Sequence, residues 1–240
     1  MTTTSSPVRR VERHPLHDLP RGVWPATLPA VRQLLDDGLD LAPGVTFLVG
    51  ENGSGKSTLV EAVAAAYGLN AEGGSRGARH STRASESPLG DVLRVVRSPG
   101  PLVASYFLRA ETMHGLYTYL EDNPAPGEAR FHEMSHGESF LEVLRSRFHG
   151  YGFFLLDEPE SALSFRSCLA LLALLDDLTR EGAQVLCATH SPLLASLPGA
   201  TLLEIGEHGI RETAYDDLDV VRDWRDFLAA PERYLRHLLG

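Results

Sequence analysis

Residues 50–58 read Gly-Glu-Asn-Gly-Ser-Gly-Lys-Ser-Thr and match the pattern G-x-x-x-x-G-K-[ST] at every fixed position. The residues before this stretch, 45–49 (VTFLV), are apolar or β-branched and predict a buried strand. Residues 58–67 (TLVEAVAAAY) are rich in alanine and leucine and predict a helix. A glycine-rich turn between a strand and a helix is the setting that the motif requires, which disfavours a chance match in an ordinary turn. The stretch therefore predicts a phosphate-binding loop.

The residue types in this loop suit a nucleoside triphosphate. Glycines let backbone N–H groups close around phosphate oxygens because no Cβ stands in the way. The N-terminus of the following helix adds unpaired N–H groups and a partial positive charge. Lys56 can reach the β- and γ-phosphates, and the Ser57 hydroxyl can supply a ligand to Mg²⁺. We expect the nucleotide to be bound by Gly50, Glu51, Asn52, Gly53, Ser54, Gly55, Lys56, Ser57 and Thr58.

Two further predicted strands end in ionisable side chains. Residues 151–156 (YGFFLL) lead into the acidic run 157–160 (DEPE), and residues 184–189 (QVLCAT) lead into His190. Neighbouring carboxylates at the end of a buried strand are costly unless a cation or hydrogen bonds compensate them. Ligands of open parallel sheets bind at the carboxyl ends of the strands, so we expect these groups beside the phosphate loop.

These side chains have complementary roles around a triphosphate. Asp157 can join Ser57 as an oxygen ligand of Mg²⁺. The Glu158 carboxylate can accept a proton from an attacking water, and His190 can sense the γ-phosphate. Trp24 is interpreted as a core or surface anchor, with stacking on a nucleotide base as the alternative.

The motifs in this order resemble those of ABC-type ATPases, and most closely the soluble branch with SMC-like, RecF-like, overcoming-lysogenisation-defect-like and stand-alone members. Residues 50–58 resemble the Walker A loop, and residues 153–158 (FFLLDE) resemble Walker B with its catalytic glutamate. Residues 161–163 (SAL) resemble the D-loop, and residues 188–191 (ATHS) resemble the switch-histidine turn. Residues 135–138 (SHGE) resemble a variant of the signature motif, whose family form is Ser-Gly-Gly-Gln.

The resemblance implies an ATPase that uses ATP and Mg²⁺, with Lys56, Glu158 and His190 as catalytic residues. It implies a homodimer that forms on ATP binding, in which Ser135 and Gly137 hold the γ-phosphate of the nucleotide on the opposite subunit.

Three positions depart from the family pattern. His136 replaces a signature glycine and Glu138 replaces the glutamine, and Glu111 stands where the Q-loop glutamine is expected. Ser135 followed by Glu138 also fits a capping box at the start of a helix, which is a purely structural alternative for the signature stretch.

The expected fold class is α/β. It is a P-loop NTPase with a mostly parallel sheet flanked by helices, as in ABC ATPases, and with an N-terminal antiparallel β portion. Residues 39–41 and 45–49 are expected to pair as a hairpin. We expect a flexible tail over residues 1–14, a single ATPase domain over residues 15–215, and helices over residues 216–240 that pack on that domain.

Inside the domain, residues 70–90 are expected to form a mobile loop and residues 112–148 a reduced helical arm. Only 79 positions separate Lys56 from Ser135, which leaves no room for the long coiled coil of SMC-type proteins. Only 24 positions separate Glu111 from Ser135, so the arm is small, which disfavours docking on a membrane subunit.

The composition limits the kinds of partner that the protein is expected to bind. The chain of 240 residues has a formal net charge of −10, which argues against strong non-specific binding to nucleic acid and leaves DNA as a weakly supported partner. No apolar run approaches the roughly 20 residues of a membrane-spanning helix, and the first residues lack a signal-peptide core. We therefore expect a cytoplasmic protein that acts on an unidentified effector. A regulatory nucleotide switch with little hydrolysis and the ATPase subunit of a transporter are the alternatives.

Overall fold

The structure is a computed structural model that describes residues 6–70, 73–75, 87–100, 103–111 and 136–239. Ser135, most of the expected helical arm over residues 112–148 and most of the expected loop over residues 70–90 lie outside the described residues.

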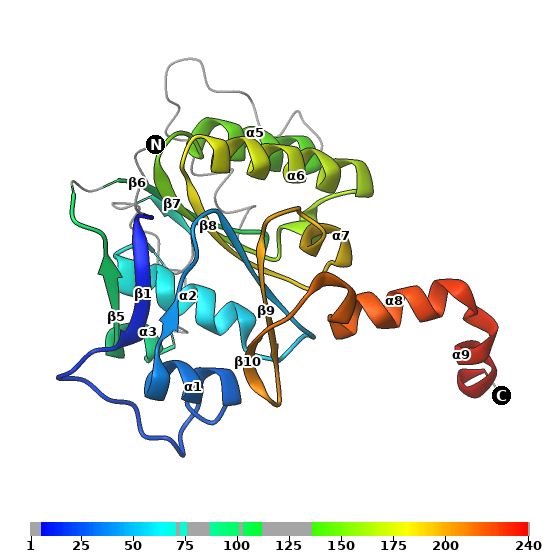
Figure 1. The fold of residues 1–240 in the computed structure, drawn as a ribbon, viewed down its shortest axis with the longest axis horizontal. Helices are drawn as coiled ribbons and strands as arrows, with labels where there is room; N and C mark the ends of the chain where they lie inside the picture. Colours follow the sequence, from blue (N-terminus) through cyan, green and yellow to red (C-terminus); the bar gives the residue numbers. More distant parts are fainter. Residues whose placement is uncertain (1–5, 71–72, 76–86, 101–102, 112–135, 240) are drawn as a thin grey trace.

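A seven-stranded sheet forms the centre of the fold (Figure 1). Its order is β10-β9-β3-β8-β7-β6-β4, in which the five strands from β9 to β6 are parallel and the two outer strands are antiparallel. The strands are β3 (Val45–Val49), β4 (Gly74–Ser75), β6 (Ala104–Arg109), β7 (Gly152–Asp157), β8 (Gln184–Thr189), β9 (Thr201–Gly206) and β10 (Gly209–Glu212). Every residue of β3, β7 and β8 is buried, as expected for parallel strands that are covered on both faces.

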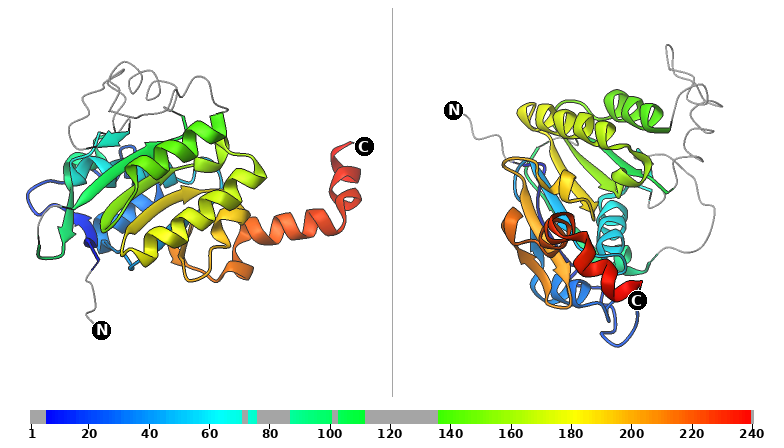
Figure 2. Two further views of the ribbon diagram at one scale, coloured as in Figure 1. Left: turned by 90° about the horizontal axis from the view of Figure 1, so that it is seen from above. Right: turned by 90° about the vertical axis from the view of Figure 1, so that its right-hand side faces the viewer.

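Helices cover both faces of this sheet (Figures 1 and 2). One face carries α1 (Pro29–Asp37), α2 (Lys56–Tyr67) and α3 (Leu89–Val92), and the other carries α5 (His136–Arg147), α6 (Phe165–Arg180) and α7 (Pro192–Ala195). Alternate strand residues face the two sides, so Phe47 belongs to the core under α5 and α6 while Leu48 belongs to the core under α1 and α2. The mixed α/β class with a mostly parallel sheet is confirmed.

The expected N-terminal antiparallel portion is a three-stranded sheet of order β2-β1-β5, made of β1 (Val8–Arg13), β2 (Leu39–Asp40) and β5 (Leu93–Arg97). The predicted hairpin between residues 39–41 and 45–49 is wrong, because β2 pairs with β1 whereas β3 lies between β8 and β9. A fully buried strand such as β3 is more stable with a partner on each edge than in a surface hairpin.

The expected flexible tail over residues 1–14 is corrected for its second half, because strand β1 occupies residues 8–13. Val8 and Val11 are fully buried, and β1 pairs with β5 along its length. The buried side chain of Gln184 fixes the start of β1: its Oε1 accepts the Val8 N–H and its Nε2 donates to the Val8 carbonyl, both at 2.9 Å. The burial of two valines and the pairing of the backbone stabilise this strand, although most of its side chains are charged.

A short 3₁₀ turn, η2 (Pro159–Ala162), lies between β7 and α6. A second one, η3 (Tyr215–Asp217), precedes the last two helices, α8 (Asp219–Ala229) and α9 (Pro231–Leu238). These two helices project from the body of the molecule (Figure 1). The expectation that they pack on the domain holds only for the first turn of α8, where Val221 is buried. Large apolar side chains further along are exposed: Trp224, Leu228, Tyr234, Leu235 and Leu238. Within the described part of the chain, no helix is both long and apolar enough to cross a membrane.

Candidate nucleotide site

The glycine-rich loop connects β3 to α2, as the sequence predicts, and its glycines are required by the backbone. Gly53 and Gly55 have φ of 82° and 102°, which side chains other than glycine rarely adopt. Gly50 lies against β9, and a Cβ at this position would be 2.3 Å from the carbonyl oxygen of Ile205. The loop is therefore shaped by two left-handed residues and one close backbone contact, and α2 begins directly after it at Lys56.

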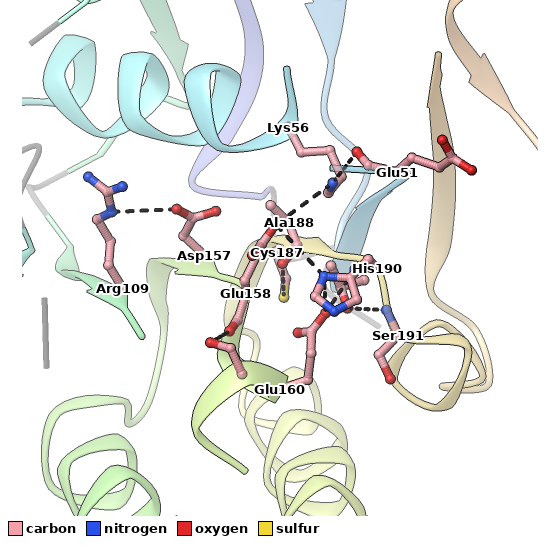
Figure 3. A network of polar contacts seen from close by, with 12 residues as sticks. Glu51, Lys56, Arg109, Asp157, Glu158, Glu160, Cys187, Ala188, His190 and Ser191 are labelled. Carbon is pink, nitrogen blue, oxygen red and sulfur yellow. Dashed lines mark hydrogen bonds and ion pairs between the residues drawn. The ribbon is translucent and has the colours of Figure 1, made fainter. Parts of the chain in front are cut away.

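Lys56 is 2% exposed, and its Nζ donates a hydrogen bond to the carbonyl oxygen of Glu51 at 2.8 Å (Figure 3). Burial lowers the pKa of the Lys56 ammonium, whereas the nearby carboxylates, Glu158 first, act to raise it. An ammonium held in a poorly solvated loop among carboxylates gains strongly when a polyanion enters. Its environment fits a phosphate-binding lysine.

Asp157 ends β7 and is almost completely buried. Burial raises the pKa of its carboxyl group, while a hydrogen bond with Ser57 and the charge of Arg109 oppose the rise. Its Oδ1 is buried and, among the described residues, has no hydrogen-bond partner. An unpaired carboxylate oxygen beside the Ser57 hydroxyl is the donor set that a divalent cation requires.

The protein supplies only part of a coordination shell. Among the described residues, no group of three or more histidine, cysteine and acidic side chains could hold a metal ion. Mg²⁺ typically takes one or two protein oxygens and completes its shell with waters and substrate phosphates. Ser57 and Asp157 therefore fit a Mg²⁺ ion that arrives with a nucleotide better than a resident metal.

Glu158 is the one residue other than glycine with positive φ in the described part of the chain, at φ 46° and ψ 51°. Such a conformation costs about 1–3 kcal/mol and is concentrated at functional sites. Its N–H donates to the carbonyl oxygen of Ala188 at 3.0 Å, which ties the turn to β8. The conformation directs the Glu158 carboxylate into the space between Lys56 and His190, 3.8 Å from Lys56 Nζ and 3.8 Å from His190 Nδ1.

His190 follows β8, and the sequence interpretation of its surroundings missed Glu160. The Oε1 of Glu160 accepts hydrogen bonds from the Thr189 hydroxyl at 2.6 Å and from the His190 N–H at 2.7 Å (Figure 3). The acidic run 157–160 could have indicated this role, because Glu160, the last carboxylate of the run, also needs a compensating partner next to a buried strand.

Arg109 is a second residue that sequence reasoning missed. It ends β6, and its Nε lies 3.4 Å from Asp157 Oδ2 while its Nη2 lies 2.8 Å from Glu61. Glu111, expected in place of the Q-loop glutamine, is 83% exposed and pairs with Arg109 at 3.2 Å. The side chain nearest Asp157 from this strand end is therefore a guanidinium rather than Glu111.

The signature stretch is described only from residue 136 onward. Gly137 lies in the first turn of α5, where a Cβ would be 3.2 Å from Ser167 Oγ and 3.6 Å from the Ala162 carbonyl oxygen. The start of α5 therefore lies directly against the D-loop, residues 161–163, and this close approach requires a residue without a large side chain.

Hollows flank the phosphate loop in the described part of the structure. Trp24 is 54% exposed and is therefore not a core residue; it borders a cavity of about 270 Å³ that is also lined by Gly53, Lys56 and Ser57. A larger cleft of about 1060 Å³ lies between the loop, His190 and the first turns of α8, including Trp224.

A glycine loop with a buried lysine, a carboxylate pair and a histidine at the carboxyl edge of a parallel sheet defines a P-loop nucleotide-binding domain. Two family models match the sequence. One, described as "AAA domain, putative AbiEii toxin, Type IV TA system", matches residues 115–196, and one described as "AAA domain" matches residues 28–93. Each match covers part of the chain, and together with the fold the two matches support a P-loop ATPase of the ABC/AAA type.

A solved structure described as "An inward-facing conformation of a putative metal-chelate type ABC transporter" shares the fold, with a TM-score of 0.51 and 16% identity, over 88% of this chain and 84% of that chain. The SMC head domain from Thermotoga maritima aligns with a TM-score of 0.44 and 16% identity, over 74% and 93%. The protein cbiO1 from Clostridium perfringens, part of the ABC transporter complex cbiONQ, aligns with a TM-score of 0.45 and 16% identity, over 84% and 90%. No curated protein matches the sequence.

Proposed function

We propose that the protein binds ATP with Mg²⁺ at this site and hydrolyses it. The observation that carries the proposal is the meeting of three separate segments at one edge of the sheet. The Glu158 carboxylate lies 3.8 Å from both Lys56 Nζ and His190 Nδ1, although the three residues come from the loop after β3, the turn after β7 and the turn after β8.

Each residue has a definite task in such a reaction. The loop N–H groups and Lys56 bind the phosphates, and Ser57 and Asp157 hold the Mg²⁺ ion. When bound, Mg²⁺ offsets charge on the phosphate oxygens. Glu158 orients the attacking water and accepts its proton, and its exposed fraction of 30% leaves it accessible to that water. His190 contacts the γ-phosphate from the next strand end and offsets its developing charge.

The catalytic unit that we propose is a dimer in which each ATP is enclosed between two copies. Ser135 and Gly137 of one copy contact the γ-phosphate bound to the other copy. Support for this arrangement comes from the position of Gly137, whose turn lies against the D-loop at the same edge of the sheet as Lys56. ATP closes the pair because the γ-phosphate gains contacts only in the closed state. The cycle acts on an effector, and the net charge of −10 favours a protein over DNA.

Phosphate release by the purified protein tests this function. We expect Mg²⁺-dependent turnover in the wild type, loss of turnover and of ATP binding in Lys56→Ala, and loss of turnover with ATP binding retained in Glu158→Gln. Arg180→Ala is the matched control, because Arg180 pairs only with exposed acids on its own helix among the contacts of the described residues. Light scattering should show Glu158→Gln as an ATP-dependent dimer, and a folded variant that stays monomeric in ATP contradicts the dimer.

The same assay separates the alternative of a regulatory switch. A wild-type protein that binds ATP through Lys56, changes its association state and releases no phosphate is a nucleotide switch rather than an ATPase. Turnover that Lys56→Ala abolishes excludes that alternative.

A further inference from the structure

Glu160 contacts the turn that carries His190 from a different segment of the chain. It lies in η2, beside the D-loop, and its side chain is 9% exposed. Its Oε1 accepts two hydrogen bonds from the end of β8, one from the Thr189 hydroxyl and one from the His190 N–H, at 2.6 and 2.7 Å. One carboxylate oxygen therefore joins the D-loop segment to the switch turn.

The network continues beyond this oxygen. The Thr189 hydroxyl accepts the N–H of Ser191 at 3.0 Å, and the Ser191 hydroxyl accepts the N–H of Leu194 at 3.3 Å as the N-cap of α7. Thr189 is fully buried, so no water competes for these bonds. Glu160 thus orders the residues on both sides of His190.

The imidazole ring of His190 lies beside this network, but among the described residues its Nδ1 forms no hydrogen bond. Its Nδ1 lies 3.4 Å from Glu160 Oε1 and 3.8 Å from Glu158 Oε1. In the described part of the structure, His190 Nδ1 and Glu160 Oε2 are both buried without a hydrogen-bond partner. Buried polar atoms are nearly always paired in native structures, so two such neighbours indicate a second arrangement within a short movement.

We propose that Glu160 is a positioning residue that couples the position of the D-loop to the orientation of His190. This inference rests on the proposed function, in which the nucleotide on a second copy is contacted by the turn of Gly137, which lies against the D-loop. A shift of η2 carries the Glu160 carboxylate with it and pairs it with the Nδ1–H of His190. The opposite ring nitrogen, Nε2, then faces the γ-phosphate. Contact with the partner is in this way transmitted to the residue that contacts the nucleotide.

The first test needs no nucleotide and measures the amide exchange rate of His190 by NMR. Glu160→Ala removes the acceptor of the His190 N–H, and we expect exchange to rise at least tenfold. Glu160→Gln keeps an acceptor oxygen at the same place, so its rate should stay within about threefold of wild type. Glu181→Ala is the control, because Glu181 accepts the N–H of Gly150 at 2.8 Å on an exposed surface away from this turn.

The second test separates kcat from nucleotide affinity. A misplacement of about 1 Å at a catalytic group costs about 100-fold in rate, so Glu160→Ala should lower kcat by about that factor. The Kd for MgATP should not rise more than threefold, because in the described part of the structure Glu160 forms no hydrogen bond or ion pair with the loop. Removal of its negative charge, which acts on Lys56, does not weaken phosphate binding. Glu160→Gln should recover at least tenfold of the loss, which a general packing defect would not allow.

The exchange rate of the His190 amide tests the role of Glu160 even if the protein does not hydrolyse ATP. A wild-type protein without turnover removes the proposed function, and the exchange rate then decides whether Glu160 orders the switch turn. Unchanged exchange in Glu160→Ala overturns the inference. So does an equal fall in kcat and nucleotide affinity with no recovery in Glu160→Gln, since that pattern indicates a purely structural role.

Discussion

Lys56 Nζ lies 3.8 Å from Glu158 Oε1 across the edge of the parallel sheet, and Lys56 is the only lysine in the 240-residue sequence. The pair connects the residue that binds phosphate to the residue that accepts the proton of water. Because no other lysine exists in the chain, the ammonium group of this site can be observed by itself in the intact protein.

The first prediction concerns the protonation of Lys56. Burial lowers its pKa from the usual value, and Glu158 is the strongest of the carboxylates that act to raise it. Glu158→Gln removes that charge, so we expect the pKa of Lys56 to fall further, whereas bound MgATP should raise it by adding negative charge. Selective ¹³C labelling of lysine gives a single side-chain NMR signal for the titration. A pKa that does not change in Glu158→Gln contradicts the pairing.

The second prediction concerns Gly50. A Cβ here would meet the backbone carbonyl of Ile205 at 2.3 Å, and neither backbone can move freely. Gly50→Ala should therefore displace the loop, destabilise the protein by about 1–3 kcal/mol and weaken ATP binding strongly. Gly22→Ala is the matched control, because nothing lies within 4 Å of a Cβ at that position. Urea unfolding and nucleotide titration of both variants measure the difference.

The parts of the fold that could be predicted are those encoded within short segments. The loop at 50–58 and the runs FFLLDE and CATH each combine a buried strand with the chemical groups that follow it, so local pattern and site coincide. These segments predicted a parallel sheet with Asp157, Glu158 and His190 at one edge. The structure has this parallel pairing and these three residues at that edge.

The parts that could not be predicted depend on contacts between distant segments. Strand β1 is mostly charged (VRRVER) and shows no clean alternation, and it is ordered by pairing with Val95 and its neighbours more than 80 residues away. Arg109 has no motif of its own, and only the pairing of β6 with β7 brings it to Asp157. For α8 and α9, the expected packing on the domain reaches only the first turn of α8, and the large apolar side chains beyond it are exposed.

The third prediction concerns Arg109. Its guanidinium lies 2.8 Å from Glu61 and 3.4 Å from Asp157, and it is only 14% exposed. Arg109→Ala leaves two largely buried carboxylates without this cation, so we expect a loss of about 1–3 kcal/mol in the free energy of unfolding. Arg180→Ala, which breaks exposed pairs on α6, should change stability by less than about 0.5 kcal/mol. Equal effects in the two variants would show that Arg109 does not compensate the buried acids.

The fourth prediction concerns the anchor of α8. Glu204 is 4% exposed, and its Oε1 accepts the N–H of Asp219 at 2.8 Å while Arg211 pairs with its other oxygen. Burial acts to raise the pKa of Glu204, but the Asp219 N–H and Arg211 outweigh burial and hold it below the usual value. A lowered pKa in the folded state means that the ionised carboxylate stabilises the protein fully above the unfolded value of about 4.5. That stabilisation is lost as the pH falls through the folded value.

Glu204→Gln tests this linkage, because glutamine keeps an acceptor for Asp219 but loses the charge that binds Arg211. We expect a loss of about 1–2 kcal/mol in the free energy of unfolding at pH 7, since hydrogen bonds to charged groups exceed neutral ones by about that amount. The difference from wild type should shrink as the pH falls below about 4.5, because the wild-type carboxyl group becomes protonated as well. Urea unfolding at several pH values measures this convergence, with Glu181→Gln as an exposed control. A difference that stays constant down to acid pH would mean that Glu204 anchors α8 by shape alone rather than by its charge.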